Sequence, residues 1–277
     1  MVENKQKTVQ RSRFEFGKNW QRFLKVLDED HIAEAVHSLK EMLEVEDLNG
    51  KSFLDIGSGS GLFSLAARRL GAQVHSFDYD PLSVVCTAEL KSRFFPNDAS
   101  WIIEEGSVLD EAYMKSLGKF DIVYSWGVLH HTGSMWHALA NIALSVAERG
   151  QLFIAIYNDQ GDKSRGWKMV KRFYNSSAIG RVLVVGIFFP YFFLGGFAKD
   201  VFHLRNPLRR YREYKKSRGM SAFRDWFDWL GGYPFEVAKP EEIFDFYRTK
   251  GYRLERLKTC GGGLGNNEFV FRLNSSE

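Results

Sequence analysis

Several features that mark special classes of protein are scarce in this sequence. Its 277 residues include only two cysteines, Cys86 and Cys260, which can form neither a disulfide framework nor a four-thiolate zinc site. The first 13 residues are polar and lack the apolar stretch of a secretory signal. There is no internal repeat and no low-complexity tract. A folded protein of the reducing cytoplasm is therefore expected.

An excess of charge of one sign is also missing. The 38 Lys plus Arg and 34 Asp plus Glu give a net charge of +4, which alone indicates neither a nucleic-acid nor a membrane partner. The composition, 44% hydrophobic and 26% charged, is that of an ordinary folded protein, so wholesale disorder is excluded. The chain length is near the upper limit for one hydrophobic core and favours one elaborated domain.

The hydrophobic pattern predicts an α/β protein. Between positions 20 and 43, apolar residues recur at spacings of three and four, as in amphipathic helices. Short apolar runs then alternate with helical segments, which argues for a parallel sheet covered on both faces. The predicted strands are 52–56, 73–77, 101–103, 121–125, 151–157, 252–259 and 268–273, and the predicted helices are 62–70, a stretch after Pro81, 111–117, 135–147 and 240–250.

This pattern divides the chain into four segments. A helical cap spans 1–50, the body of the sheet spans 51–157, and the chain returns to it at 240–277. The segment 158–239 has no clear strand alternation and exceeds any ordinary connection. We expect it to be a large helical insertion between the fifth and sixth strands.

A glycine-rich turn follows the first predicted strand. In Gly57-Ser58-Gly59-Ser60-Gly61 the glycines permit a sharp turn and the close approach of a ligand to the backbone. Asp78 comes 21 residues after Gly57, at the end of the second strand, where a carboxylate can accept hydrogen bonds from ribose hydroxyls. Dinucleotide-binding turns read Gly-x-Gly-x-x-Gly, but Leu62 stands where their third glycine would fall.

Three motifs carry a family resemblance. Residues 54–61, Leu-Asp-Ile-Gly-Ser-Gly-Ser-Gly, closely resemble motif I of the class I S-adenosylmethionine-dependent methyltransferases, and Asp78-Tyr79-Asp80-Pro81 is similar to the segment after their second strand. Residues 120–131, which end in Val-Leu-His-His, resemble the ubiquinone-type small-molecule methyltransferases. The motifs cover residues 52 to about 157. The resemblance implies a Rossmann-like sheet of seven strands, mostly parallel, with helices on both faces and an antiparallel strand near the end.

The same resemblance implies S-adenosylmethionine as the cofactor. Asp78 would hold the ribose and Tyr79 would lie against the adenine. The family usually has Gly-Asp after the third strand, whereas this chain has Gly106-Ser107, so Ser107 and backbone amides would contact the adenine. The candidate cofactor residues are Arg13, Trp20, Asp55, Gly57, Ser58, Gly59, Gly61, Asp78, Tyr79, Ser107, Val108, Ser125 and Trp126.

Two of these candidates have simpler alternatives. Arg13 either pairs with the methionine carboxylate of the cofactor or is a solvated side chain. Trp20 either folds over the cofactor or packs in the core.

His130 and His131 are the candidate catalytic residues. Transfer of a sulfonium methyl needs an aligned nucleophile, the exclusion of water and, for an oxygen nucleophile, a proton acceptor, for which histidine is suited. The pair follows the fourth strand, at the edge where the methyl would be presented. Adjacent residues cannot both point the same way, and we favour His131 as the base. The alternative is that the pair is structural or orients the substrate. The acids and histidines show no short metal-ligand spacing, so no metal is expected.

Candidate substrate contacts fall in two places. Tyr157 and Asn158 follow the fifth strand, although capping of the next helix by Asn158 and Asp159 is the favoured interpretation there. Trp229, Tyr233 and Glu236 lie in an aromatic and acidic stretch just before the chain returns to the core, and this stretch either shapes a pocket or forms an aromatic plug.

The insertion divides the charge unevenly. Residues 158–240 hold 16 Lys plus Arg and 7 Asp plus Glu, so their net charge is 16 − 7 = +9 and that of the rest is 4 − 9 = −5. Residues 182–198 carry no charge, but they include Pro190, and a single membrane crossing would separate the last strands from their sheet. The alternatives are a lid, a homodimer contact, or a peripheral membrane contact through residues 181–218 at the inner face of the membrane. The plain alternative is a solvated basic helix beside a buried one.

The predicted function is methyl transfer from S-adenosylmethionine to a small-molecule acceptor, by O-methylation of an apolar or amphiphilic substrate. An RNA methyltransferase is the enzyme alternative because the insertion is basic, although no separate RNA-binding module is present, so a nucleic-acid partner is disfavoured. A non-catalytic cofactor-binding or interaction protein with the same fold is the alternative of another class.

Overall fold

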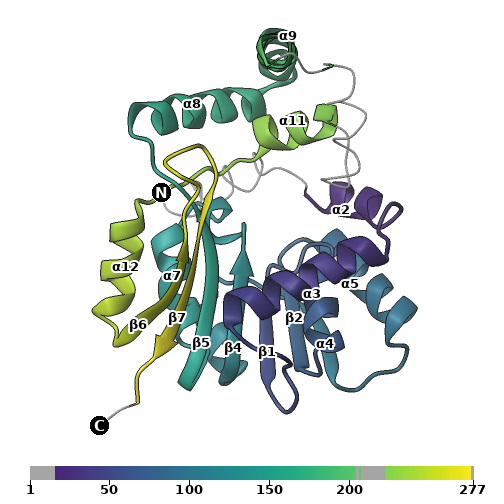
Figure 1. Ribbon diagram of the computed structural model, residues 1–277, viewed down its shortest axis with the longest axis vertical. Coiled ribbons are helices and arrows are strands. Elements are labelled where there is room, and N and C mark those ends of the chain that lie inside the picture. The colour runs from purple at the N-terminus through teal and green to yellow at the C-terminus, as the bar shows by residue number, and fades with distance from the viewer. Residues whose placement is uncertain (1–15, 204–205, 207–221, 276–277) are drawn as a thin grey trace. The chain divides into compact units, whose positions relative to one another are not determined.

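A seven-stranded sheet forms the centre of the computed structural model, which describes residues 16–203, 206 and 222–275 (Figure 1). The strand order is β3-β2-β1-β4-β5-β7-β6. All neighbours pair in parallel except β7, which is antiparallel to both β5 and β6. The bounds are β1 (Ser52–Ile56), β2 (Gln73–Asp78), β3 (Trp101–Glu105), β4 (Phe120–Trp126), β5 (Val146–Tyr157), β6 (Tyr252–Lys258) and β7 (Asn266–Leu273). The expected mostly parallel, Rossmann-like sheet with an antiparallel strand is confirmed.

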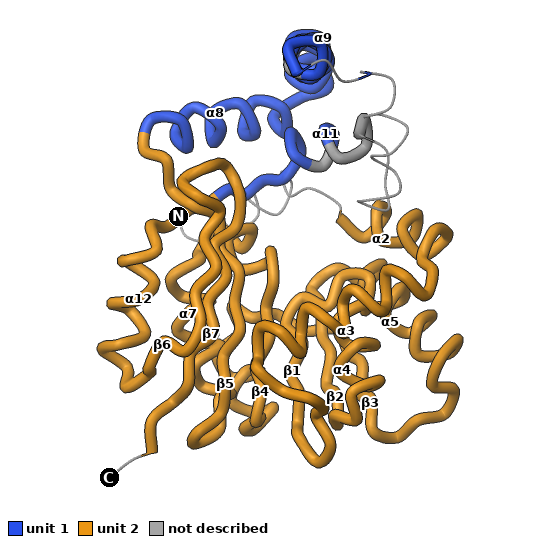
Figure 2. Tube along the Cα trace, viewed as in Figure 1, with its two compact units in different colours: residues 1–14, 162–235 blue, residues 15–161, 236–277 orange. Residues whose placement is uncertain are grey.

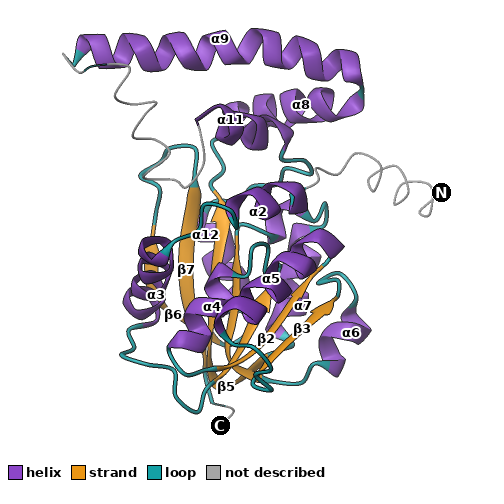
Figure 3. Ribbon diagram, turned by 90° about the vertical axis from the view of Figure 1, so that its right-hand side faces the viewer, coloured by secondary structure: helices purple, strands orange, loops and turns teal. Residues whose placement is uncertain are grey.

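Helices cover both faces of this sheet, as Figure 3 shows. One face is buried by α3 (Glu29–Leu43), α4 (Leu62–Arg69) and α5 (Pro81–Phe94), and the other by α6 (Glu111–Ser116), α7 (Met135–Ala143) and α12 (Pro240–Arg248). Each face has its own buried apolar cluster, and both clusters include side chains from β1 and β4. The strands are therefore apolar on both sides, which explains why they appear in the sequence as short continuous apolar runs.

Two predicted boundaries differ from the observed ones by more than two residues. The helix predicted over 135–147 ends at Ala143, and the fifth strand begins at Val146 rather than at Gln151. Val146 pairs with Phe120 of β4 ahead of a bulge, so the start of the strand is determined by pairing with a distant segment. Local periodicity contains no signal for that pairing.

The chain divides into two compact units (Figure 2). The sheet unit comprises residues 15–161 and 236–277 and contains the whole sheet. The helical unit comprises 1–14 and 162–235, and its described helices are α8 (Asp162–Ser176), α9 (Ala178–Phe202) and α11 (Ala222–Gly231). The prediction of a helical insertion between the fifth and sixth strands is confirmed. Within it, α9 continues through Pro190 as one helix.

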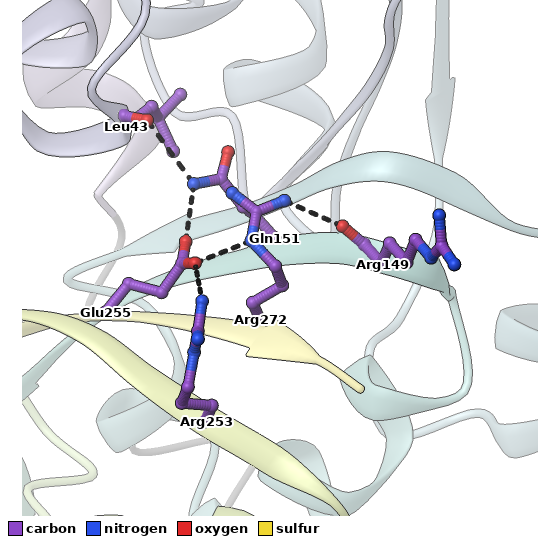
Figure 4. Close-up of polar contacts among 6 residues, drawn as sticks. All are labelled: Leu43, Arg149, Gln151, Arg253, Glu255 and Arg272. Carbon is purple, nitrogen blue, oxygen red and sulfur yellow. Dashed lines mark hydrogen bonds and ion pairs between the residues drawn. The ribbon is translucent and has the colours of Figure 1, made fainter. Parts of the chain in front are cut away.

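A polar network around Gln151, in the middle of β5, links the neighbouring strands (Figure 4). Glu255 of β6 accepts hydrogen bonds from Gln151 (3.0 Å), Arg272 (2.6 Å) and Arg253 (3.0 Å). Gln151 also donates to the backbone oxygen of Leu43 at the end of α3. Partial burial opposes ionisation of Glu255, but these hydrogen bonds outweigh it and lower its pKa. The network joins β5, β6, β7 and α3 far from the glycine-rich turn.

Candidate active site

The turn after β1 can be built only from glycine at its key positions. Gly57, Gly59 and Gly61 have φ values of 75°, 56° and 81°, in the left-handed region that favours glycine. A Cβ on Gly57 would lie 2.5 Å from the Val128 side chain, and one on Gly61 would lie 2.8 Å from the Thr87 backbone. Both the backbone conformation and the lack of space therefore account for the glycine pattern.

Asp78 lies beside this turn, as its spacing predicted. One of its carboxylate oxygens accepts a hydrogen bond from the Gly59 N–H (2.9 Å), and the other accepts from the Asp80 N–H (2.8 Å). The adjacent Tyr79 side chain is 40% exposed at the end of β2. The turn and the second strand thus place a carboxylate, backbone amides and an accessible aromatic ring together.

Asp55 and Ser58 make their contacts inside the protein. Asp55 is buried and accepts a hydrogen bond from the Ser64 hydroxyl beneath the turn. Burial, together with the negative charge of Asp78, raises the pKa of Asp55 to about 7. The Ser58 hydroxyl is 2.9 Å from the Thr87 hydroxyl. These bonds hold the turn in place, and direct contact of either side chain with a cofactor stays a prediction.

The helix α2 (Gly17–Phe23) packs against the same region of the sheet unit. The Gly17 N–H donates to the Asp80 carboxylate at 2.9 Å. The Trp20 indole nitrogen lies 3.0 Å from the point where a Gly59 Cβ would stand. Trp20 therefore lies against the glycine turn. Arg13 lies outside the described residues, and its role stays a prediction.

The remaining candidate cofactor residues lie at the ends of β3 and β4. Ser107 accepts a hydrogen bond from the Leu109 N–H, and the Val108 carbonyl accepts one from Asn141. Ser125 is buried and donates to the Ile56 carbonyl at 3.0 Å, which links β4 to the start of the turn. Trp126 follows it with a side chain that is 41% exposed.

The two histidines occupy a short 3-10 turn, η1 (Leu129–His131), directly after β4. His130 is fully buried, and the Tyr157 N–H donates to its Nδ1 at 3.3 Å. That bond makes Nδ1 an acceptor and assigns the ring proton of a neutral His130 to Nε2. His131 retains 8% exposure, and its ring centroid is 5.1 Å from that of Phe16. The His131 ring is thus the more accessible of the two.

Glu236 is the predicted substrate residue that adjoins this turn. Its backbone N–H donates to the His130 carbonyl, and its carboxylate accepts from the Met135 N–H at the start of α7, both at 3.0 Å. The Tyr157 ring lies 3.9 Å from that of His130 and 5.5 Å from that of His131, centroid to centroid. The structure thus brings Tyr157, Glu236 and both histidines together.

Asn158 does not cap the next helix, which was the role favoured from the sequence. Its side chain donates to the Gly263 carbonyl and accepts from Asn267. Asn158 therefore holds a second glycine-rich turn, residues 261–265 between β6 and β7. The Asp159 carboxylate accepts from the Gly161 N–H, and α8 begins only at Asp162. Capping of α8 by Asn158 and Asp159 was therefore wrong, because these residues are used in bonds outside the helix.

Trp229 and Tyr233 belong to the helical unit. The Nζ of the fully buried Lys171 lies 4.0 Å from the centroid of the Trp229 ring and 4.9 Å from that of Phe235. Burial lowers the pKa of Lys171 to about 7. Tyr233 is half-buried. A substrate role for Trp229 and Tyr233 stays a prediction.

Sequence reasoning missed Phe16, Val128 and Glu268. Glu268 pairs with Ala155, which pairs with Trp126, so a small residue separates the carboxylate from the indole. Burial raises the pKa of Glu268, and a hydrogen bond with Trp126 opposes the shift. Of these three residues, only Val128 had a signal in the sequence that could have identified it, because it lies within the motif that follows the fourth strand. Phe16 and Glu268 reach the site through contacts between distant segments.

A family model described as a methyltransferase domain matches residues 27–181, more than half of the chain. The chain belongs to the methyltransferase domain family. The match includes the glycine turn, Asp78 and the histidine turn. The resemblance to class I S-adenosylmethionine-dependent methyltransferases, drawn from these motifs, is thereby confirmed, and with it the expectation of an enzyme of this family.

Curated relatives match only part of this chain. The ribosomal protein L11 methyltransferase of Methylococcus capsulatus is 38% identical over 25% of this chain and 24% of its own length. The tRNA U34 carboxymethyltransferase of Pseudoalteromonas translucida is 31% identical over 43% and 36%. The ubiquinone biosynthesis O-methyltransferase of Escherichia fergusonii is 28% identical over 44% and 48%. The chain thus matches between about a quarter and a half of each of these relatives.

Solved structures share the fold over most of the chain. Magnesium protoporphyrin IX methyltransferase from Synechocystis PCC 6803, crystallised with bound SAH, superposes with a TM-score of 0.54. The superposition covers 93% of this chain and 94% of that one at 13% sequence identity. The fold is therefore that of a methyltransferase over nearly the whole length.

Proposed function

We propose that this protein transfers a methyl group from S-adenosylmethionine to an oxygen atom of a small apolar or amphiphilic acceptor. The observation that carries the proposal is the Asp78 carboxylate, bonded to the Gly59 amide at a turn of left-handed glycines. The ubiquinone biosynthesis O-methyltransferase of Escherichia fergusonii, which is 28% identical over 44% of this chain, is named for methyl transfer to oxygen, and this supports the choice of acceptor.

The residues around the turn fit an adenosyl cofactor. The absence of Cβ atoms at Gly57 and Gly59 lets the Val128 and Trp20 side chains pack directly against the turn, so these side chains would enclose a cofactor held at the turn. Asp78 would hold the ribose hydroxyls, and Tyr79 offers an exposed ring for the adenine. When bound, S-adenosylmethionine supplies an electrophilic methyl group.

The protein must then orient the acceptor and remove its proton. His131 is the less buried of the two histidines, so we assign proton removal to its imidazole. His130 acts as a positioning residue, because its ring is held by the Tyr157 amide and its carbonyl by Glu236. The exposed Trp126 ring at the end of β4 offers an apolar surface that excludes water from an acceptor.

Calorimetry with S-adenosylmethionine tests the cofactor site. Each hydrogen bond to a charged group contributes about 1.5–3 kcal/mol, so Asp78→Ala should weaken binding on the order of 100-fold or more. Asp110→Ala is the matched control, because Asp110 loses the same charge but only caps α6. Unchanged binding in Asp78→Ala, or no binding by the intact chain, contradicts the proposal.

Turnover against pH tests the histidine assignment. His131→Asn should lower kcat by about 100-fold or more and remove the acidic limb of the pH profile. His130→Asn should change KM and stability while the acidic limb remains. Equal profiles in both variants contradict a base at His131.

The acceptor class needs its own experiment. Incubation with radiolabelled cofactor and fractionated cell extract should label the lipid-soluble small-molecule fraction. Label confined to RNA or to protein would instead favour the acceptors named for the tRNA and ribosomal protein relatives. Cofactor binding without any labelled product would favour the non-catalytic alternative.

A further inference from the structure

Helix α9 is apolar around its whole circumference. It spans 25 residues, and only 11% of its apolar stretch of 18 residues is buried. Among the described residues it is the one helix long and apolar enough to cross a membrane by length and composition. A soluble helix of this composition is normally buried on all sides, so the exposure of α9 calls for a partner.

The two faces of α9 have different surroundings. Val184, Phe188 and Phe192 point inward and pack with residues of α8 and α11 inside the helical unit. The opposite face is exposed at four large side chains between 50% and 73%, which are Ile179, Leu183, Ile187 and Leu194. At about 1.5 Å per residue the helix is about 37 Å long, so this apolar stripe is extensive.

The sheet excludes a single membrane crossing by α9. β5 precedes the helical unit and β7 follows it, yet the two strands pair continuously from Gln151↔Arg272 to Tyr157↔Asn266. Both ends of the insertion therefore lie on the same side of any bilayer. The segment 203–221 holds seven Lys plus Arg, so it cannot provide a return crossing.

The charge beside α9 identifies the partner that fits. Residues 162–203 carry seven Lys plus Arg and two Asp, a net charge of 7 − 2 = +5. Lys163, Arg165, Lys168 and Arg172 of α8 are exposed. A second copy of the chain would bring two surfaces of the same sign together, whereas an anionic bilayer complements both the charge and the apolar stripe.

We propose that the helical unit binds the surface of an anionic lipid bilayer, with α9 lying parallel to the surface and its outer face among the acyl chains. The basic residues of α8 then contact the lipid phosphates. α8 and α11 cover the inner face of α9, and its outer face stays apolar. The unit therefore has one polar and one apolar side, as an interfacial element has. This binding does not depend on methyl transfer.

Flotation of the full chain with vesicles tests this proposal. We expect the protein to float with vesicles of phosphatidylcholine and phosphatidylglycerol, and at least about tenfold less with phosphatidylcholine alone. The double variant Ile187→Glu with Leu194→Glu should weaken flotation more than about tenfold, because it places two charges in the apolar stripe. Substituting Lys163, Arg165 and Lys168 by Gln should weaken only the dependence on phosphatidylglycerol.

The matched control carries the same charges elsewhere. Val85→Glu with Ile102→Glu alters two side chains of the sheet unit that are 55% and 52% exposed, and it should float like the unmodified chain. Circular dichroism and cofactor calorimetry confirm that each variant folds.

Three results would overturn the proposal. One is the absence of flotation at low salt, and another is equal flotation of the Ile187/Leu194 variant and the control. The third is a lipid-free dimer that the same variant dissociates while vesicle binding is absent, which would assign the stripe to a second copy. Asp78→Ala should still float, so failure of the cofactor site and failure of membrane binding are distinguishable.

Discussion

The sheet unit and the helical unit bury their apolar residues in contrasting ways. The sheet unit encloses two large apolar clusters, one on each face, whose members are almost fully buried. In the helical unit, Tyr174, Val184 and Leu230 are the buried hydrophobic residues of the described cluster, and many larger side chains around them are only partly covered. The difference teaches that the sheet unit completes its own hydrophobic core, whereas the helical unit leaves a large apolar surface exposed.

Gly57→Ala should have the largest effect on the sheet unit. The positive φ costs about 1–2 kcal/mol for a residue with a Cβ, and the clash with Val128 adds about 1–3 kcal/mol. Gly118→Ala is the control, because Gly118 has a φ of 81° with nothing near its missing Cβ. Urea unfolding should show a loss at least about 1 kcal/mol greater for Gly57→Ala, and equal losses would contradict the steric account.

The substitution Lys171→Met tests how the buried lysine of the helical unit makes the stability of the protein depend on pH. The folded pKa of about 7 lies below the value of about 10.4 for an unfolded lysine, so the unfolded state binds more protons between these values. Wild-type stability should therefore rise with pH from about 7 to about 10, while Lys171→Met should lack this rise and be more stable by about 1 kcal/mol at neutral pH.

Lys168→Met is the matched control for this experiment, since Lys168 is exposed one turn away in α8. Urea denaturation followed by circular dichroism at several pH values measures the slope. A wild-type curve as flat as that of Lys171→Met would mean that the ring and the backbone carbonyl of Trp229, to which Lys171 donates a hydrogen bond, together keep the buried ammonium charged.

Asp55 should give the wild-type sheet unit the opposite slope of stability against pH, which Asp55→Asn should remove. The folded pKa of Asp55, about 7, lies above the unfolded value of about 3.9, so the folded state binds more protons between these values. Wild-type stability should fall as pH rises from about 4 to about 7, by a few kcal/mol at most. Asp55→Asn, which retains an acceptor for Ser64, should lack that fall, and thermal unfolding across this range measures it. An identical fall in the variant would assign it to other groups.

Glu255→Gln should have the smallest effect. The substitution weakens the charged hydrogen bonds from Arg253 and Arg272, and the partial exposure of Arg253 limits the loss to about 1 kcal/mol. Glu46→Gln, at a 94% exposed side chain paired with Lys40, should change the melting temperature by less. A larger loss at Glu46 would contradict a stabilising role for the network.

Much of the sheet unit could be predicted because its signals are local. Apolar runs such as 52–56 and 73–77 match observed strands almost to the residue, and the spacing of Gly57 and Asp78 placed both at one turn. Boundaries and contacts set by distant pairing could not be predicted. The start of β5 at Val146 depends on Phe120, and the fixed position of Asn158 depends on the Gly261–Gly265 turn, about a hundred residues away in the chain.

The helical unit was harder to predict for a physical reason. An apolar run such as 182–198 suits a buried, an interfacial or a paired helix equally well, because periodicity cannot distinguish the environments of a helix that is apolar all round. Pro190 suggested a break, yet α9 continues through it. Only the exposure of individual side chains separates the two faces of that helix.

The two ends of the insertion are tied to each other. Ala238 donates its N–H to the Tyr157 carbonyl, and Asp159 donates its N–H to the Ala238 carbonyl, so the chain leaves the sheet unit and re-enters it at one point. A short linker could therefore replace residues 162–235 at little cost in loop-closure entropy. The helical unit could in this sense be exchanged for another segment. A protein that evolves from this one could then bind a new target while it keeps the glycine turn after β1 unchanged.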